Sequence, residues 1–279
     1  KVKLFPYTTL FGSSFISMKK IYNYLNKYEP EIQTGKLKLE RINDIKFDNV
    51  YFSYNNDRQI LSNISINVNN NDKIAIVGRT GCGKTTLVNL LCRFYDVSKG
   101  SIFINGENIN NYTLESLREN IGYVMQDVVI FDGNIYDNIN YANKDVQKEQ
   151  IETICKKLRL HDKIISFSEG YELNLNKNQD LFSLGEKQMI NFARIMVENP
   201  SVVILDEITS SLSYENEELV KNAIKEITKD KICFIIAHRL TTIKSCNKIL
   251  YMENGKILEN GSHQELMDIK GKYYNLVKN

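Results

Sequence analysis

The segment GRTGCGKTT, residues 78–86, combines glycines, a lysine and hydroxyls in a spacing that suits phosphate binding. It fits the pattern G-x-x-x-x-G-K-[ST] and stands between an apolar strand-like run, KIAIVG, and an apolar helix-like run, TLVNLLCRF. In such a loop successive N–H groups curl around the β-phosphate, Lys84 reaches the β- and γ-oxygens, and the Thr85 hydroxyl ligates Mg²⁺. The pattern predicts a nucleotide-binding loop made of Gly78, Arg79, Thr80, Gly81, Cys82, Gly83, Lys84, Thr85 and Thr86.

A second motif, SVVILDE, places two carboxylates at the end of a buried-type strand. Asp206 is positioned to hold Mg²⁺ through water, and Glu207 to polarise an attacking water, which are two roles that a phosphoryl-transfer site needs. An acidic pair in this position is also common as a helix N-cap. A long inserted segment separates this pair from Lys84.

Several short elements must position these motifs. IKFDNVYFSY alternates as a strand does, QILSNISINV follows, and SVVILD and KICFIIA are typical of buried strands next to helical sequence. The run NNND, residues 69–72, predicts a turn, and KILYMENGKILE predicts a hairpin that turns at Asn254-Gly255. We therefore expect an α/β fold with some antiparallel strands.

The N-terminal region has a different pattern. Between Phe15 and Leu25 apolar residues recur at three- and four-residue steps, which predicts a helix that ends near Pro30. That helix either packs on its own domain or is the end of a longer helix. Residues 31–43 are polar and without period, and we expect a linker there. Residues 1–17 are apolar only in pieces, so we expect no spanning helix, which needs about 18–20 apolar residues, and no cleavable signal.

Composition narrows the class of protein. The 279 residues are 42% hydrophobic and 25% charged, as in a globular protein. With 36 basic and 34 acidic residues the net charge of +2 gives no electrostatic reason to expect a nucleic-acid partner. Five scattered cysteines without a C-x-x-C pair indicate a reducing compartment and no zinc site.

With these motifs in order, residues 44 to about 275 resemble the nucleotide-binding domains of ABC transporters of the exporter type. Tyr54 matches the aromatic residue that stacks on adenine, a role that suits a flat ring. Gln126 matches the glutamine loop, which senses Mg²⁺ and water and faces the transmembrane part. His238, in IIAHRL, matches the switch histidine that contacts the γ-phosphate, and NGKILENGSHQEL matches the C-terminal hairpin and helix. The resemblance implies that metal binding involves Thr85, Gln126 and Asp206.

The stretch DLFSLGEKQ matches the family's signature, LSGGQ, with departures. In the family this helix N-terminus presents a serine and a glycine, here Ser183 and Gly185, to the γ-phosphate on a partner domain. Leu184 stands where the family has a glycine, and Ser213 where it has an aspartate. NKNQ, residues 176–179, replaces a GERG-like loop, while the GEKQ ending is similar to that of mitochondrial and heavy-metal-tolerance half-transporters. We expect weakened composite sites.

The resemblance implies a P-loop NTPase with a RecA-like parallel-sheet core, an antiparallel β portion and a helical signature portion over about residues 127–195. It further implies MgATP hydrolysis by two paired domains, identical or not, which powers export through transmembrane helices. Residues 1–30 would be the end of the last such helix, and the domain would face the cytosol or matrix. Two alternatives stay open: a soluble ABC-type ATPase acting on DNA or ribosomes, and a regulatory nucleotide-binding module with little hydrolysis.

Overall fold

A computed structural model of the chain describes residues 35–54, 58–125, 127–141, 146–206, 214–237 and 240–278. These belong to one compact unit that begins at Gly35. The helix expected between Phe15 and Leu25 lies outside the described residues. So do four residues singled out above, Gln126, Glu207, Ser213 and His238.

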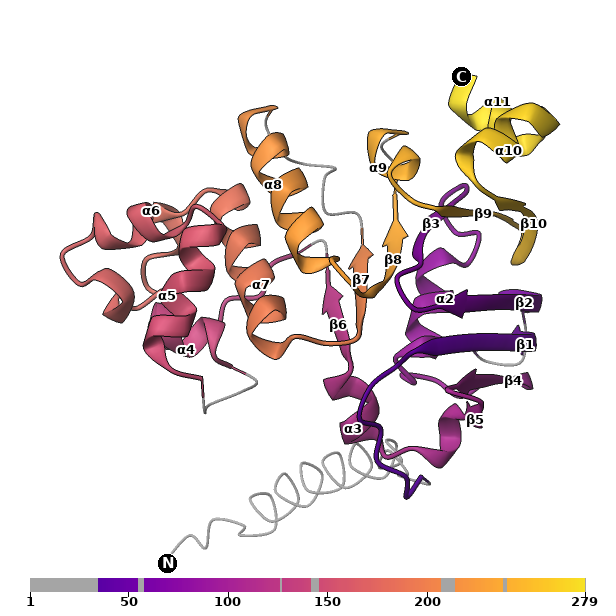
Figure 1. Ribbon diagram of the computed structural model, residues 1–279, viewed down its shortest axis with the longest axis horizontal. Coiled ribbons are helices and arrows are strands. Elements are labelled where there is room, and N and C mark those ends of the chain that lie inside the picture. The colour runs from indigo at the N-terminus through magenta and orange to yellow at the C-terminus, as the bar shows by residue number, and fades with distance from the viewer. Residues whose placement is uncertain are drawn as a thin grey trace, which may run out of the picture. The chain divides into compact units, whose positions relative to one another are not determined.

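A six-stranded sheet in the order β10-β9-β3-β8-β7-β6 forms the centre of this unit (Figure 1). The pairs β3–β8, β3–β9, β7–β8 and β6–β7 are parallel, and only β10 runs antiparallel to its neighbour. The inner strands are continuous apolar runs because both faces of the sheet are covered. Their bounds are β3 (Lys73–Val77), β6 (Ile121–Val124), β7 (Val202–Asp206), β8 (Ile232–Ile236), β9 (Lys248–Glu253) and β10 (Lys256–Gly261).

A second, four-stranded sheet is antiparallel throughout, in the order β2-β1-β4-β5. Buried and exposed residues alternate along β2, as expected for a strand with one face on the core and one in solvent. The bounds are β1 (Asp44–Phe52), β2 (Leu61–Asn69), β4 (Lys99–Ile104) and β5 (Glu107–Asn108).

Helices complete the unit. Those of residues 135–198 gather beside the β6 edge of the six-stranded sheet, as Figure 1 shows. They fall in the segment expected to be helical, although its last helix runs on to Glu198. This group comprises α4 (Ile135–Ile139), α5 (Lys148–Lys157), α6 (His161–Ile165), η2 (Gly170–Glu172), η3 (Gln179–Leu181) and α7 (Leu184–Glu198). The others are α2 (Lys84–Leu91), η1 (Ile109–Asn111), α3 (Leu114–Glu119), α8 (Tyr214–Ile227), α9 (Leu240–Lys244), α10 (His263–Ile269) and α11 (Lys272–Lys278).

Two hydrophobic cores lie on opposite faces of the six-stranded sheet. Along β3, Ala75 and Val77 belong to the core shared with α4, α5 and α7, whereas Ile74 and Ile76 belong to the core shared with the antiparallel sheet and α2. This division follows from the pleat, which sends successive side chains to opposite faces. The central strands are thereby held from both sides, and so are the loops that leave them.

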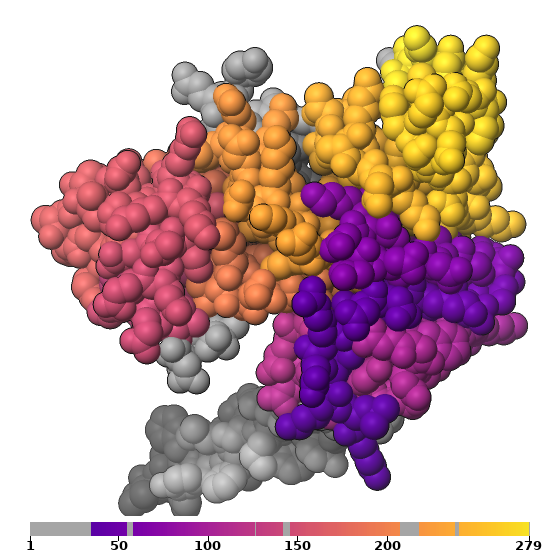
Figure 2. Space-filling model, in the orientation of Figure 1, coloured from indigo at the N-terminus to yellow at the C-terminus, as the bar shows by residue number. Residues whose placement is uncertain are grey.

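The predicted hairpin at the C-terminal end is confirmed. Asn254 and Gly255 both have positive φ, 49° and 73°, as a two-residue primed turn requires. The turn packs on the antiparallel sheet, where Ser62 N–H donates to the Gly255 carbonyl at 2.8 Å. In Figure 2 the yellow C-terminal segment accordingly lies against the violet residues of β2.

Residues 35–43, within the segment expected to be a linker, form no helix or strand but are fastened to the domain. Leu39 and Ile42 are buried in the core under the antiparallel sheet. The Asn120 side chain donates to the Leu39 carbonyl at 2.9 Å, and Ile42 N–H donates to the Ser201 hydroxyl at 3.1 Å. No helix among the residues that the structure describes is long and apolar enough to cross a membrane.

Candidate nucleotide-binding site

The phosphate-binding loop is built on three glycines with positive φ, Gly78 (149°), Gly81 (78°) and Gly83 (106°). A Cβ on Gly78 would lie 2.1 Å from the Met252 carbonyl oxygen, and one on Gly83 would lie 2.7 Å from Leu61 Cδ2. A Cβ on Gly81 would meet nothing within 4 Å. The loop is therefore packed tightly at both ends on β9 and β2, while its middle faces open space where a ligand can approach the backbone.

Helix α2 begins in this loop. Its N-cap is Gly83, so no side chain accepts a hydrogen bond from the backbone N–H groups of its first turn. Lys84 is buried and its ammonium donates to the carbonyls of Gly78 at 2.9 Å and Arg79 at 3.2 Å, whereas Thr85 is exposed. N–H groups, a helix dipole and a cation thus converge on one spot, which favours an anion.

The parallel register brings Asp206 to the same edge of the sheet. In β8, Ile236 pairs with Ile76 on one side and with Asp206 on the other. Asp206 is consequently level with Ile76, which lies two residues before Gly78. Strand β8 lies between β3 and β7, so these two strands are about 10 Å apart. Figure 1 shows β7 and β8 running in the same direction to that edge, and β3 is parallel to β8.

Sequence reasoning missed a partner of this carboxylate, Tyr123 in β6. The Tyr123 hydroxyl donates to Asp206 Oδ2 at 3.1 Å. Burial first, and then the charge of Asp206, raises the pKa of Tyr123, so the phenol stays protonated and keeps donating. The sequence of β6 gives no signal for this contact, because the contact depends on the neighbouring strand, β7.

The residues present fit a nucleoside triphosphate with Mg²⁺. A hydroxyl, Thr85, and a carboxylate, Asp206, are hard oxygen ligands of the kind that Mg²⁺ prefers. Among the described residues no group of three or more His, Cys, Asp and Glu side chains forms a metal cage of its own. Mg²⁺ is usually held by one or two protein ligands together with substrate phosphates and water.

Tyr54, the expected adenine-stacking residue, lies just beyond β1 and is 45% exposed. Its hydroxyl shares a 3.1 Å hydrogen bond with the hydroxyl of Thr86 in α2. The ring is therefore tied directly to Thr86, the last residue of the phosphate loop. Arg79 and Thr80 are exposed in that loop, and Cys82 is buried beneath it.

The signature residues stand at the start of α7. Ser183 is the N-cap, and it forms a capping box in which its hydroxyl accepts from Glu186 N–H at 3.3 Å and its N–H donates to the Glu186 carboxylate at 2.7 Å. Leu184 is 44% exposed, whereas Gly185 is buried. Within this chain the Leu184 side chain is open to whatever approaches the start of the helix.

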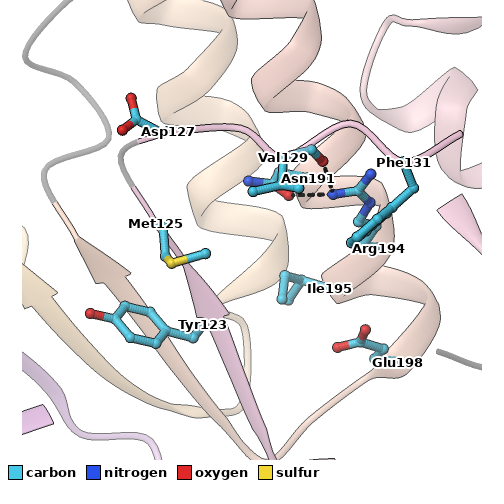
Figure 3. Close-up of a pocket in the computed structure, with 9 residues that line it drawn as sticks. All are labelled: Tyr123, Met125, Asp127, Val129, Phe131, Asn191, Arg194, Ile195 and Glu198. Atoms are coloured by element: carbon cyan, nitrogen blue, oxygen red, sulfur yellow. Dashed lines mark hydrogen bonds between the residues drawn. The ribbon is translucent and has the colours of Figure 1, made fainter. Parts of the chain in front are cut away.

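A pocket of about 210 Å³ opens beside Met125 and Asp127, between β6 and α7 (Figure 3). Arg194 fixes its wall, since the guanidinium donates to the Val129 carbonyl at 2.8 Å and to Asn138 O at 2.7 Å. Burial raises the pKa of Glu198 and Arg194 partly opposes that change. The lining residues are Tyr123, Met125, Asp127, Val129, Phe131, Asn191, Arg194, Ile195 and Glu198.

Of the expected site residues, the structure brings together the loop of residues 78–86, Tyr54 and the carboxyl end of β7. Gln126 and His238 lie outside the described residues, but each comes two residues after a strand that ends at this edge, β6 or β8. Glu207 directly follows Asp206. Ser183 and Gly185 belong to the helical group and have no contact with the phosphate loop among the hydrogen bonds described.

Known proteins match this sequence and fold. The ABC transporter family profile matches residues 61–210, more than half of the chain. YgaD of Bacillus subtilis, named as a multidrug export ATP-binding/permease protein, is 39% identical over 277 residues, covering 98% of this chain and 48% of its own. The mitochondrial iron-sulfur clusters transporter ABCB7 of Oryzias latipes is 40% identical over 230 residues, covering 82% of this chain and 31% of its own.

A solved structure agrees with these relatives. A bacterial Atm1-family ABC exporter with ATP bound superposes with a TM-score of 0.84 at 32% identity, over 95% of this chain and 47% of that one. The chain spans about half or less of the length of the relatives it matches. By family profile, fold and glycine loop together, the chain belongs to the ABC transporter family, as a nucleotide-binding domain of the exporter type.

Proposed function

We propose that the chain binds MgATP in the loop of residues 78–86 and, when paired with a second such domain, hydrolyses it to drive export of a substrate across a membrane. The observation that carries the proposal is the register of β3, β8 and β7, which places Asp206 one strand away from the base of the glycine loop. Lys84, Thr85 and the start of α2 supply the cation, the hydroxyl and the N–H groups.

In this proposal each group has a defined task. The N–H groups of the loop and the Lys84 ammonium hold the phosphate oxygens, and Tyr54 stacks on the base. Bound Mg²⁺, held by Thr85, Asp206 and Gln126, would neutralise charge on the β- and γ-phosphates. Tyr123 orients the Asp206 carboxylate through the hydrogen bond at 3.1 Å.

Hydrolysis needs a base and a sensor of the γ-phosphate. Glu207 accepts a proton from the attacking water as the new oxygen–phosphorus bond forms and the bond to the ADP oxygen breaks. His238 contacts the γ-phosphate from the end of β8. Both assignments rest on the resemblance. They are supported by the positions of Glu207 and His238 in the sequence, because each residue follows a strand that ends at this edge of the sheet.

The second half of each site would come from a partner domain, identical or not. Ser183 and Gly185 at the start of α7 would face the γ-phosphate held by that partner. The exposed isobutyl group of Leu184 would lie between the helix start and the partner's γ-phosphate. The Ser183 hydroxyl already accepts a hydrogen bond from Glu186 N–H. We therefore infer slow hydrolysis when two copies of this domain pair.

Coupling to transport requires a membrane part. We infer transmembrane helices in the whole protein, with this domain on the cytosolic or matrix side and residues 1–30 leading to it. The pocket beside Met125 and Asp127, walled by Arg194, is the surface that we assign to contact with the transmembrane part, because its lining residues flank Gln126 in sequence and Gln126 matches the loop that faces that part. The transported substrate would be selected by those helices.

The test is ATP turnover by the whole protein in lipid vesicles, comparing wild type with Glu207→Gln. The amide cannot accept the proton but keeps the shape of the site, so the variant should bind ATP and lose turnover by about two orders of magnitude or more. Glu226→Gln, which changes an exposed carboxylate in α8, serves as the matched control. Equal turnover by wild type and Glu207→Gln would refute the assigned role.

A further inference from the structure

Three aromatic rings meet at the expected adenine-binding position, and only one of them is accounted for by the proposed function. Tyr54 contacts Phe52 with ring centroids 4.9 Å apart and Tyr95 with centroids 5.0 Å apart, both at an interplanar angle of 85°. Phe52 and Tyr95 are themselves 5.6 Å apart at 52°. Tyr54 thus meets two neighbours nearly at right angles, and those two neighbours also contact each other.

The geometry leaves room for a ligand on Tyr54. Neither neighbour lies parallel over the ring as a stacked partner would, and 45% of Tyr54 is exposed. Perpendicular contacts between aromatic rings are attractive, because the positive edge of one ring meets the negative face of the other. Such contacts fix the tilt of a ring without using up all of its stacking surface.

The support that Tyr95 provides is itself rigid. Tyr95 lies in the turn between α2 and β4, where Phe94 N–H donates to the Asn89 carbonyl at 3.0 Å and Arg118 Nη2 donates to the Arg93 carbonyl at 3.1 Å. Ser98 N–H donates to the Tyr51 carbonyl at 2.9 Å and ties the turn to the end of β1. The side chain of Tyr95 is nevertheless 47% exposed, so it is not held there to fill the core.

We propose that Tyr95 is a positioning residue for nucleotide binding: it holds the ring of Tyr54 in the orientation that stacks on the base. This inference rests on the proposed function, in which Tyr54 stacks on adenine. Phe52 supports Tyr54 from the buried side, and the Thr86 hydroxyl fixes its phenolic end. Tyr95 adds a second perpendicular contact next to that of Phe52, and the ordering it provides makes base binding tighter.

The experiment is calorimetric titration of the 279-residue chain with MgATP and, separately, with magnesium tripolyphosphate, which has no base. Tyr95→Ala should weaken ATP binding about two- to tenfold, the worth of one aromatic pair, and leave tripolyphosphate binding unchanged. Tyr95→Phe keeps the ring and should bind ATP as wild type does. Phe94→Ala is the matched control, an equally exposed aromatic of the same turn whose described ring contact is with Arg118.

A double substitution separates positioning from direct contact. In a Tyr54→Ala background, Tyr95→Ala should cause no further loss, because Tyr95 acts through Tyr54. A further loss there, or a loss of tripolyphosphate affinity, would overturn the positioning role. If Tyr54→Ala alone leaves ATP affinity unchanged, the stacking assignment of Tyr54 fails. If Tyr54→Ala weakens ATP binding and Tyr95→Ala does not, only the role of Tyr95 fails.

Tyr95→Leu keeps apolar bulk without a ring and should behave as Tyr95→Ala does. It gives the same decision should the alanine variant fold poorly.

Discussion

Lys84 donates a hydrogen bond from its ammonium nitrogen to the backbone carbonyl of Gly78 at 2.9 Å, so the cation of the phosphate loop is held by the loop itself. An ammonium group has three donors, and Arg79 O takes a second at 3.2 Å. A phosphate that enters the loop offers charged oxygens in place of neutral carbonyls, and charge-assisted hydrogen bonds are stronger. Replacing the two carbonyl partners of Lys84 by phosphate oxygens therefore favours ATP binding, and the buried side chain need not rearrange.

The loop glycines allow a matched pair of substitutions. Gly78 and Gly81 both have positive φ, so alanine at either position costs about 1–3 kcal/mol of backbone strain. Only Gly78→Ala also drives a methyl group to 2.1 Å from the Met252 carbonyl of β9. In urea unfolding we expect a loss near the strain value for Gly81→Ala and a clearly larger loss for Gly78→Ala; equal losses would contradict the packing described.

The signature departures predict a gain of activity. Leu184 and Ser213 stand where the family has glycine and aspartate, and one misplaced donor at such a site costs about 3 kcal/mol, or roughly a hundredfold in rate. Leu184→Gly combined with Ser213→Asp in the full-length self-paired protein should raise ATPase activity at least several-fold. Leu181→Gly, on an equally exposed neighbour, should not. An unchanged rate in the double variant would mean that the departures are tolerated.

The segment before β1 should contribute to stability through Asn120. This buried side chain donates to the carbonyls of Leu39 at 2.9 Å and Ser116 at 3.0 Å, and it accepts from the Ser201 hydroxyl at 2.6 Å. Asn120→Ala leaves buried partners unsatisfied and should lower the free energy of unfolding by about 1–3 kcal/mol. The exposed Asn275→Ala is the control, and similar small losses in both variants would show that residues 35–43 are not anchored in this way.

Two buried thiols should lower the stability of the folded chain at alkaline pH. Burial raises the pKa of Cys92 and of Cys155 from 9.0 to about 12. The unfolded chain loses these protons first, so the stability they contribute is complete below pH 9.0 and is lost as the pH rises from there toward about 12. Under reducing conditions the urea midpoint should fall over that window, and less steeply in Cys92→Ala and Cys155→Ala. Parallel curves for wild type and both variants would argue against the burial of these thiols.

Local patterns were sufficient for part of this structure. The glycine loop between a strand and a helix, and the hairpin at Asn254-Gly255, could be predicted because their signals lie within a few adjacent residues. Tyr123 beside Asp206 and Tyr95 beside Tyr54 could not, since each pair is joined by the fold across a long stretch of chain. The contacts that bury Leu39 and Ile42 likewise involve residues far along the sequence, Asn120 and Ser201. The polar composition of residues 35–43 gives no sign of these contacts.

The most direct measurement of the central claim is calorimetric titration of MgATP into wild type and Lys84→Ala. Loss of a charge-assisted contact to phosphate should weaken binding by about tenfold or more. Lys46→Ala, which removes an exposed lysine paired only with Asp48 among its described ion pairs, should bind as wild type does. Equal ATP affinity for wild type and Lys84→Ala, with both chains folded, would contradict the assignment of residues 78–86 as the ATP-binding loop.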